Sequence, residues 1–467
     1  MTQAPDRPLR VAVIGSGPAG VYASDLLSKS DAVADGDLEV SIDIFDRYPA
    51  PFGLIRYGVA PDHPRIKGII TSLHKIMENP AIRFFGNVEY GTDITLAELQ
   101  ERYDAVIFAT GAYYDASLHI PGVDLDGSYG AADFVAWYDG HPDVSREWPL
   151  EAREIAVLGN GNVALDVARV LSKHADDLLV TEIPDNVYEG FKKSPVTDVH
   201  IFGRRGPAQM KFTPLELREL AKSRDVDIVL YDEDFEFDEA SRAAIESNNQ
   251  IKAMIKTLDK WREEQKENPG TASRRLHLHF LQSPAEIVGD ENGKVRAIRM
   301  ERNELDGAGG IRPTGETIEY SVQAVYRAIG YFGSELPEVG YDKLRGVIPN
   351  QEGRVLDETE SPIPGLYATG WIKRGPVGLI GSTKSDALET ITHLIEDHSF
   401  SASDAEPEHV NEFLDAKGVR FTTWDGWHTL DEHERSLGEA ATDAAGQPRK
   451  RVKVVPREDM VNISRGE

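Results

Sequence analysis

The sequence predicts an α/β protein with two Rossmann-like dinucleotide-binding domains, one of them inserted into the other. An apolar strand at residues 11–14 runs into a glycine-rich turn at 15–20, and the same pattern returns at 155–158 and 159–164. Each turn has the form G-x-G-x-x-G/A and precedes apolar residues at helical spacing. In such a unit the backbone N–H groups and the positive end of the helix face a pyrophosphate. Two units therefore predict two bound dinucleotides, between which electrons pass.

The residues after the first turn support this interpretation, although a single turn of this kind is a weak signal. A second strand at 40–45 ends on Asp46, and an acid at this place binds a ribose 2′-hydroxyl. FAD and NAD both fit that pattern. A long loop at 51–64 is apolar and aromatic yet rich in Pro and Gly, which is typical of a cofactor lining or an exposed patch. Further elements are expected as a helix at 66–77 and strands at 82–88 and 103–111.

The residues after the second turn differ in charge. The corresponding strand at 199–202 ends in Gly-Arg-Arg-Gly at 203–206, where no acid stands. Two adjacent guanidinium groups, Arg204 and Arg205, suit a 2′-phosphate and therefore indicate NADP(H). The alternative is a solvated pair of surface arginines.

The order of elements predicts how the domains are arranged. Residues 113–330 form an insertion that begins its own βαβ unit at residue 154. It contains a charged helical stretch at 239–267, a Gly-rich hairpin turn at 306–310 and a closing strand at 322–329. The chain then returns to the character of its first part, with a strand at 365–370 and a glycine-rich turn at 375–382. We therefore expect a discontinuous FAD-binding domain (1–112 and 331–467) and an NADP-binding domain (113–330). In the tail, 398–409 is expected to be a linker and the basic run 449–451 to lie on the surface.

Composition excludes several classes of protein. A chain of 467 residues with 40% hydrophobic and 28% charged residues is typical of a globular protein of two or three domains. The net charge of −28 argues against nucleic acid as a partner. No apolar run approaches the ~20 residues of a membrane span. The first ten residues are polar and unlike a signal peptide, so a cytoplasmic protein is expected.

The chain contains no cysteine. A thiolate-bound iron–sulfur cluster and a redox-active disulfide are therefore excluded on this chain. The 13 histidines show no ligand spacing, and no metal site is expected. Electrons that enter this protein must leave to a separate molecule.

Taken together, these motifs resemble the two-dinucleotide flavoproteins, and within them the adrenodoxin-reductase-type ferredoxin–NADP reductases. The resemblance covers essentially the whole chain. Its most specific parts are the loop 51–64 and the pair Gly370-Trp371, because most members of the broader superfamily carry an acid after that glycine. The chain is also similar to the small subunit of glutamate synthase, but that protein carries cluster-binding cysteines in an N-terminal extension, and this chain has neither.

The resemblance implies a set of site residues. FAD would be bound by Gly15, Gly17, Ala19, Gly20, Asp46, Leu54, Val88, Trp371, Gly378, Leu379 and Ile380. NADP(H) would be bound by Gly159, Asn160, Gly161, Asn162, Val163, Arg204, Arg205 and Glu216. The implied catalytic residues are His63, Glu216 and Trp371.

The same side chains also have plainer explanations. His63 either modulates protonation near the reacting ring or satisfies the backbone of its loop. Glu216 either contacts the nicotinamide ribose or only stabilises the first turn of its helix. Trp371 either stacks near the flavin or is a core aromatic residue. Asp166 is either a packing residue or a hydrogen-bond partner on the ribose side.

The resemblance implies an NADPH–ferredoxin oxidoreductase. Hydride would pass between NADPH and FAD, and single electrons would then pass to an external iron–sulfur protein. Two alternatives share the two-turn plan. An NADPH-dependent flavin monooxygenase would need a site for an organic substrate. A non-catalytic flavoprotein that senses pyridine nucleotides would bind both dinucleotides with negligible turnover.

Overall fold

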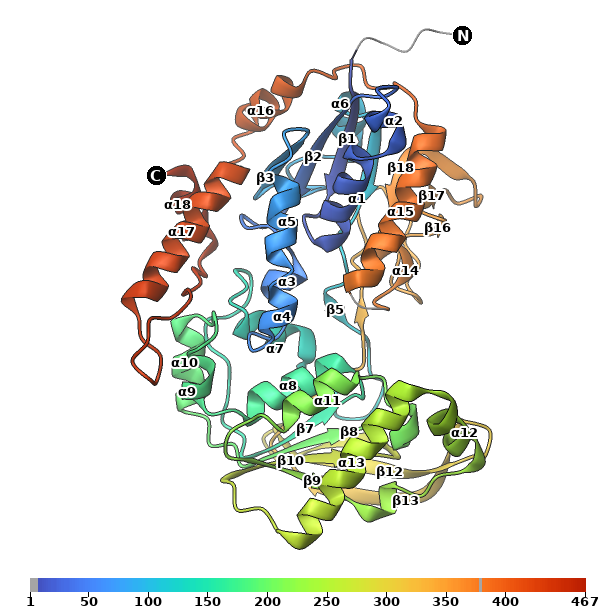
Figure 1. Cartoon of the computed structure of the whole chain (residues 1–467), viewed down its shortest axis with the longest axis vertical. Helices are drawn as coiled ribbons and strands as arrows, with labels where there is room; N and C mark the ends of the chain where they lie inside the picture. Colours follow the sequence, from blue (N-terminus) through green and yellow to red (C-terminus); the bar gives the residue numbers. More distant parts are fainter. Residues whose placement is uncertain (1–6, 378–379) are drawn as a thin grey trace.

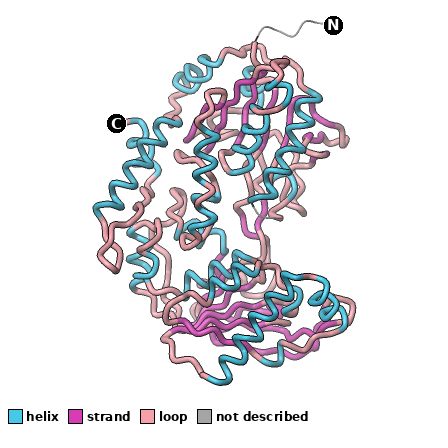
Figure 2. The backbone as a smooth tube through the Cα atoms, in the orientation of Figure 1, coloured by secondary structure: helices cyan, strands magenta, loops and turns pink. Residues whose placement is uncertain are grey.

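The computed structural model describes residues 7–377 and 380–467. Two α/β units lie end to end along the long axis of the molecule (Figure 1). The first unit combines the N-terminal segment with segments that follow residue 331, whereas the second is formed by the middle of the chain. The strands gather in two separate groups, one in each unit, with helices around them (Figure 2).

The first unit is built on a seven-stranded sheet of order β16-β17-β18-β4-β1-β2-β3. The interior strand β1 (Leu9–Ile14) is completely buried and pairs in parallel with β2 (Val40–Asp46) and β4 (Ala105–Phe108). The late strand β18 (Pro362–Ala368) pairs in parallel with β4. Residues from both ends of the chain therefore share one sheet. The other strands are β3 (Ile82–Gly86), β16 (Asn350–Gln351) and β17 (Arg354–Leu356), and the helices against the sheet include α1 (Pro18–Ser28), α5 (Ile70–Met77) and α15 (Ile380–Asp397).

The second unit is built on a six-stranded parallel sheet of order β6-β14-β7-β8-β10-β9. Its strands are β6 (Ser128–Gly130), β7 (Glu154–Leu158), β8 (Asp198–Phe202), β9 (Val226–Leu230), β10 (Arg274–His279) and β14 (Ala324–Arg327). The major helices are α8 (Asn162–Ser172), α11 (Pro214–Leu220) and α13 (Asn249–Glu267). A three-stranded antiparallel sheet of β11 (Gln282–Gly289), β12 (Val295–Leu305) and β13 (Ile311–Ser321) packs against it. The hairpin between β12 and β13 confirms the turn expected at 306–310.

Two short crossing segments connect the units. Strands β5 (Tyr114–Asp115) and β15 (Tyr331–Phe332) pair in antiparallel fashion, one leading into the second unit and one leading out of it (Figure 1). All described strands of the six-stranded sheet lie between these crossings, which supports the proposed division at residues 113 and 330. The remaining short helices are α2 (Asp31–Ala34), α3 (Leu54–Tyr57), α4 (Pro64–Lys67), α6 (Leu96–Arg102), α7 (Ala131–Tyr138), α9 (Ala175–Leu178), α10 (Asp185–Lys192), α12 (Glu239–Ser247), α14 (Trp371–Arg374), η1 (Pro207–Gln209) and η2 (Asp232–Asp234).

Several predicted boundaries were wrong. The single helix expected at 66–77 is divided into α4 and α5 at Gly68, a poor helix former. The strand expected at 82–88 ends at Gly86, because Gly86 forms a bridge with Thr422 and Asn87 turns the chain with a φ of 58°. The strand expected at 322–329 is the shorter β14.

The C-terminal tail folds along one side of both units. Helices α16 (Pro407–Ala416), α17 (Trp424–Ala440) and α18 (Arg457–Arg465) lie beside the first unit (Figure 1). The expectation that 449–451 lies on the surface was wrong for the two arginines. Arg449 is only 4% exposed and lies 2.9 Å from Asp185, whereas Arg451 forms ion pairs with residues of α17. The chain folds back so that these arginines meet acidic partners, and the local sequence around 449–451 does not show that these partners lie nearby. Among the described helices, none combines the length and the apolar character that a membrane crossing requires.

Candidate functional site

The first glycine turn connects β1 to α1 without room for side chains. Gly15 has a φ of 113°, and a Cβ placed on it would lie 2.5 Å from the carbonyl oxygen of Ala109. A Cβ on Gly20 would lie 2.0 Å from the carbonyl oxygen of Gly15. Above Gly17, in contrast, there is open space, and no side chain caps the first N–H groups of α1. The turn therefore presents unused backbone donors to that space, as a pyrophosphate requires.

Asp46 lies at the end of β2, beside the first turn. Its Oδ2 accepts hydrogen bonds from the N–H (2.8 Å) and hydroxyl (2.5 Å) of Ser16, and its Oδ1 accepts one from the N–H of Tyr48 at 2.9 Å. Burial raises the pKa of Asp46, although these hydrogen bonds oppose the shift. Buried Val88 donates its N–H to the carbonyl oxygen of Asp46 at 2.9 Å. The structure therefore brings three of the implied FAD residues together: Gly15, Asp46 and Val88.

The loop 51–64 packs directly on the first turn. Phe52 donates its N–H to the carbonyl oxygen of Ser16 at 3.1 Å, and a Cβ on Gly53 would lie 3.1 Å from the Cα of Gly17. Leu54 begins α3 and is half-buried at the same place. The loop is therefore a wall of the space above the turn rather than an exposed patch.

Trp371 reaches the same region from the end of β18. It is the first residue of α14, and the preceding Gly370 approaches α1 so closely that a Cβ would lie 2.5 Å from the Cβ of Ala19. Asp386 of α15 accepts the N–H of Gly370 at 2.5 Å. Of the other residues implied for FAD, Gly378 and Leu379 lie outside the described residues, and Ile380 is the first residue of α15.

The second glycine turn repeats the geometry of the first. Gly159 has a φ of 146°, and a Cβ on it would lie 2.2 Å from the carbonyl oxygen of Ala328, whereas Gly161 faces open space. Two asparagines of this turn hold the segment before α11. The backbone carbonyl oxygen of Asn160 accepts the N–H of Lys211 at 3.1 Å, and the side-chain oxygen of Asn162 accepts the N–H of Thr213 at 3.2 Å. Val163 is half-buried against the core.

Arg204 and Arg205 are exposed cations on a fixed backbone. Asn303 donates to the carbonyl oxygen of Arg204 at 2.9 Å, and Leu281 donates its N–H to that of Arg205 at 3.1 Å. Within residues 7–377 and 380–467, no carboxylate lies within 4.0 Å of either guanidinium group. Lys211 is a third exposed cation beside this turn, and it too lacks an ion pair with any described residue; the sequence analysis missed it. Three positive charges without counter-charges fit a phosphorylated nucleotide.

A cluster of charged side chains joins the two units at His63. The imidazole Nε2 lies 2.8 Å from Asp166 of α8 and 2.8 Å from Glu216 of α11. Arg169 of α8 lies 3.0 Å from the same nitrogen and holds Asp62 through two contacts of 2.7 and 2.8 Å. Burial lowers the pKa of His63, but Asp166 and Glu216 outweigh it and raise the pKa to about 9. His63 is therefore cationic at neutral pH.

The structure brings together two of the three implied catalytic residues, His63 and Glu216. Asp166 belongs to the same cluster as a direct contact of the imidazole. Arg169 was missed in the sequence, although its spacing from Asp166 places both on one face of α8. Trp371 belongs to the first turn's surroundings instead, and no described contact joins it to the cluster.

Three histidines also lie together in the second unit, although their spacing in the sequence did not indicate it. His277 stacks on His200 with ring centres 4.2 Å apart, and His200 Nδ1 lies 2.9 Å from His279 Nε2. Both nitrogens of His277 are engaged, by Asp198 at 2.9 Å and by the hydroxyl of Tyr231 at 2.8 Å. The rings are nearly parallel, and one ring nitrogen of each histidine lies within 4.8 Å of the other two. The cluster is a hydrogen-bonded stack of neutral rings.

This stack predicts acid sensitivity. Burial lowers the pKa of His200 to about 3 and that of His279 to about 2. Below pH 6.5 the unfolded chain binds protons at these positions and the folded chain does not, so stability falls as the pH decreases from 6.5 toward 3. The cost is on the order of 1 kcal/mol per histidine and pH unit. In urea unfolding at pH 7.5 and 5.0, His279→Gln is expected to reduce the loss of stability at pH 5.0. Exposed His433→Gln is the control, and an equal effect of both variants would contradict the prediction.

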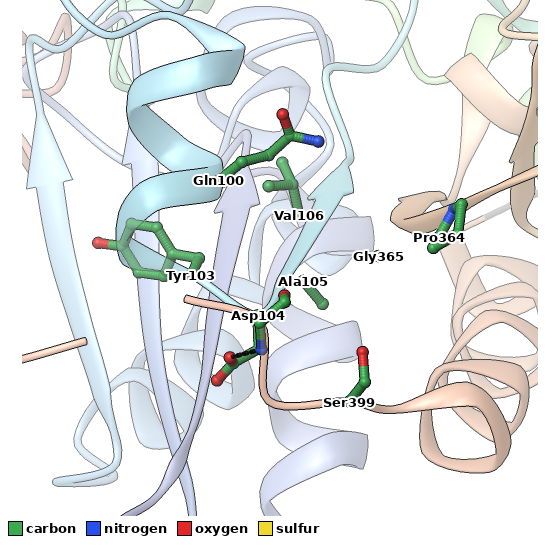
Figure 3. A pocket seen from close by; sticks show the side chains of 9 residues that line it. Gln100, Tyr103, Asp104, Ala105, Val106, Pro364, Gly365 and Ser399 are labelled. Atoms are coloured by element: carbon green, nitrogen blue, oxygen red, sulfur yellow. Dashed lines mark hydrogen bonds between the residues drawn. The ribbon is translucent and has the colours of Figure 1, made fainter. Parts of the chain in front are cut away.

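A cavity of about 240 Å³ lies at the other end of the first sheet (Figure 3). Asp104 on its wall accepts the N–H of Arg10 at 2.9 Å and pairs with Arg7. The lining residues are Gln100, Tyr103, Asp104, Ala105, Val106, Pro364, Gly365, Ser399 and Ser401. It lies where β4 begins, whereas nucleotides bind parallel sheets at the carboxyl ends of the strands. This cavity is therefore separate from the glycine turns.

Comparison with known proteins extends over the whole chain. The family described as pyridine nucleotide-disulphide oxidoreductase matches residues 9–199. NADPH-ferredoxin reductase FprA of Mycobacterium tuberculosis is 40% identical over 474 residues, which cover 98% of this chain and 100% of that protein. The mitochondrial NADPH:adrenodoxin oxidoreductase of Bos taurus is 36% identical over 456 residues, covering 95% of this chain and 90% of that protein. The solved structure of Mycobacterium tuberculosis FprA in complex with NADPH matches with a TM-score of 0.88 over 98% of this chain and 100% of that one.

Proposed function

The chain belongs to the family of NADPH-dependent ferredoxin and adrenodoxin reductases, and we propose from this membership that it is an NADPH–ferredoxin oxidoreductase with FAD as its cofactor. The observation that carries the proposal is 40% identity to an NADPH-ferredoxin reductase over essentially the full length of both chains. Two glycine turns of matching geometry in one chain support it. The electron acceptor is a ferredoxin or a similar iron–sulfur protein, as the names of the relatives indicate.

The FAD site is proposed at the first turn. The open space above Gly17 and the wall formed by the loop 51–64 fit a dinucleotide there. The backbone of the turn would hold the pyrophosphate, and Asp46 would hold the ribose hydroxyl. Leu54, Val88 and Trp371 would line the flavin. FAD supplies the hydride and single-electron chemistry when it is bound.

The NADP(H) site is proposed at the second turn. The uncapped start of α8 would hold the pyrophosphate, and Arg204 and Arg205 would bind the 2′-phosphate. Their missing counter-ions support this role. Lys211 would add a further positive charge beside the turn. The arrangement favours NADP(H) over NAD(H).

His63 and Glu216 are proposed to act where the two units meet. A cationic imidazole in contact with Asp166 and Glu216 holds a proton at Nε2 at neutral pH, at the place where the two units meet. His63 and Glu216 are both buried, so they would keep water away from a hydride transfer at this place. Trp371 would position the flavin from the opposite side. A cytoplasmic location stays a prediction from the sequence.

Anaerobic stopped-flow mixing of the flavin-containing protein with NADPH tests this function. NADPH is expected to bleach the flavin absorbance rapidly, and oxidised ferredoxin added next is expected to become reduced. Bleaching without electron transfer to any ferredoxin would contradict the proposal and favour the flavin monooxygenase. The absence of bleaching would favour the non-catalytic sensor.

A further inference from the structure

We propose that Arg169 is a positioning residue that fixes the loop 51–64 against helix α8 and thereby sets the place of His63 between the two dinucleotide sites. The proposal rests on the proposed function and adds to it a residue that does not itself contact either cofactor in the scheme above. Arg169 acts through Asp62 and Asp166.

The contacts of Arg169 are specific in geometry. Its Nε and Nη2 lie 2.8 and 2.7 Å from the two oxygens of Asp62, and its Nη1 lies 2.9 Å from Asp166. The residue is only 1% exposed. A planar guanidinium in a bidentate pair determines both distance and orientation, which a lysine ammonium in its place cannot do. Lys173, one helical turn later, adds a contact of 2.6 Å to Asp62.

These contacts connect the two nucleotide turns by a short path. Helix α8 begins at the second glycine turn, and Arg169 lies two turns along it. The loop that carries Asp62 and His63 packs on the first glycine turn through Phe52. The Arg169–Asp62 pair therefore joins the element that carries one turn to the element that covers the other. A change in the geometry of the Arg169–Asp62 pair would change the separation of the two cofactors. The rate of hydride transfer is sensitive to a misplacement of about 1 Å.

Arg169 also acts on the imidazole electrostatically. The charged groups that face His63 are Asp166 and Arg169 from α8, Glu216 from α11, and Asp62 from its own loop. The two nearest carboxylates favour the protonated ring, whereas the guanidinium at 3.0 Å opposes it. Loss of the Arg169 guanidinium removes the positive charge that disfavours the protonated ring, and it also removes the ion pair between Arg169 and Asp166. The pKa of His63 is then expected to rise.

Two variants separate charge from geometry. Arg169→Lys retains the positive charge but loses the bidentate pair, and Arg169→Gln loses both. The matched control is Arg449→Gln, which removes another buried arginine that holds the tail against the second unit but does not contact His63. His63→Gln assigns the imidazole signal in the NMR spectrum.

The first measurement is an NMR pH titration of His63 in the flavin-containing protein. Arg169→Gln is expected to raise its pKa by about one unit, and Arg169→Lys to leave it near the wild-type value. The second measurement is flavin reduction at saturating NADPH, for which both variants are expected to be about 10-fold slower with little change in KM. Arg449→Gln is expected to change neither quantity.

The proposal is overturned if Arg169→Gln leaves both the pKa of His63 and the rate at saturating NADPH unchanged, or if Arg449→Gln causes an equal loss of rate. If Arg169→Gln does not fold, the rate of flavin reduction of Arg169→Lys at saturating NADPH is the test, and an unchanged rate overturns the proposal. The NMR titration needs no electron acceptor, so a failure of the proposed ferredoxin activity would be recognised separately from a failure of this inference.

Discussion

Replacement of Arg204 and Arg205 together by glutamine is expected to raise the KM for NADPH about 100-fold while leaving the KM for NADH nearly unchanged. A hydrogen bond to a charged group contributes about 1.5–3 kcal/mol, and two such bonds to a 2′-phosphate give at least this factor. Glutamine removes the charge and the guanidinium fork but keeps a polar side chain at each position. The pair has no described carboxylate partner, so its loss breaks no ion pair of the protein itself.

Steady-state reduction of an artificial electron acceptor with each coenzyme measures this effect. Arg312→Gln is the matched control, because this exposed arginine of the same unit pairs with Glu304 at 2.7 Å and lies on the β12–β13 hairpin. It is expected to leave both KM values unchanged. An equal rise of both KM values in the double variant would show that the arginines support the fold or the pyrophosphate rather than the 2′-phosphate.

Glu434→Gln is expected to lower the free energy of unfolding by about 3 kcal/mol. This carboxylate of α17 is fully buried and pairs with Arg56 of the loop 51–64 at 3.0 Å and with Arg451 of the tail at 3.1 Å. It also accepts the N–H of Val454 at 2.9 Å. A neutral side chain at this position leaves two guanidinium groups with one counter-charge fewer in a buried environment. The tail and the loop are therefore expected to loosen together.

Urea unfolding of the purified protein measures this loss, and the flavin content measures the loosening of the loop. Glu458→Gln is the control, since Glu458 pairs with Arg420 but is largely exposed. Such surface pairs contribute about 0–1 kcal/mol. If the two variants lose equal stability, the tail is not held by this buried pair.

Local patterns in the sequence were sufficient to predict the framework. The strand that leads into the turn at Gly15, the strand that ends on Asp46 and the strand that ends before Arg204 each lie where they were expected. These features depend on neighbours along the chain: apolar residues mark buried strands, and glycine marks a turn without room for a Cβ. The insertion of one unit in another followed from the order of such patterns, and the sheet order is consistent with it.

Contacts between distant segments could not be predicted in the same way. His63 and Glu216 were implied as site residues by resemblance, but their meeting depends on how the two units pack. The basic run at 449–451 was expected on the surface, because three adjacent cations are usually solvated. The tail instead brings Arg449 to Asp185 of the second unit and Arg451 to Glu434 of its own helix α17. The histidine stack of β8 and β10 likewise needs the register of two strands that lie far apart in the sequence.

The sequence by itself determined the two glycine turns, the charge at the end of each second strand and the absence of any thiolate ligand, because these depend on residue type and local spacing. Only the tertiary structure decided that Asp62 and His63 meet α8 and α11, and that Glu434 is buried between two arginines. Each charged side chain has many potential partners of opposite charge in a chain with 79 acidic and 51 basic residues. Packing of the two units selects among them, because burial makes an unpaired charge costly.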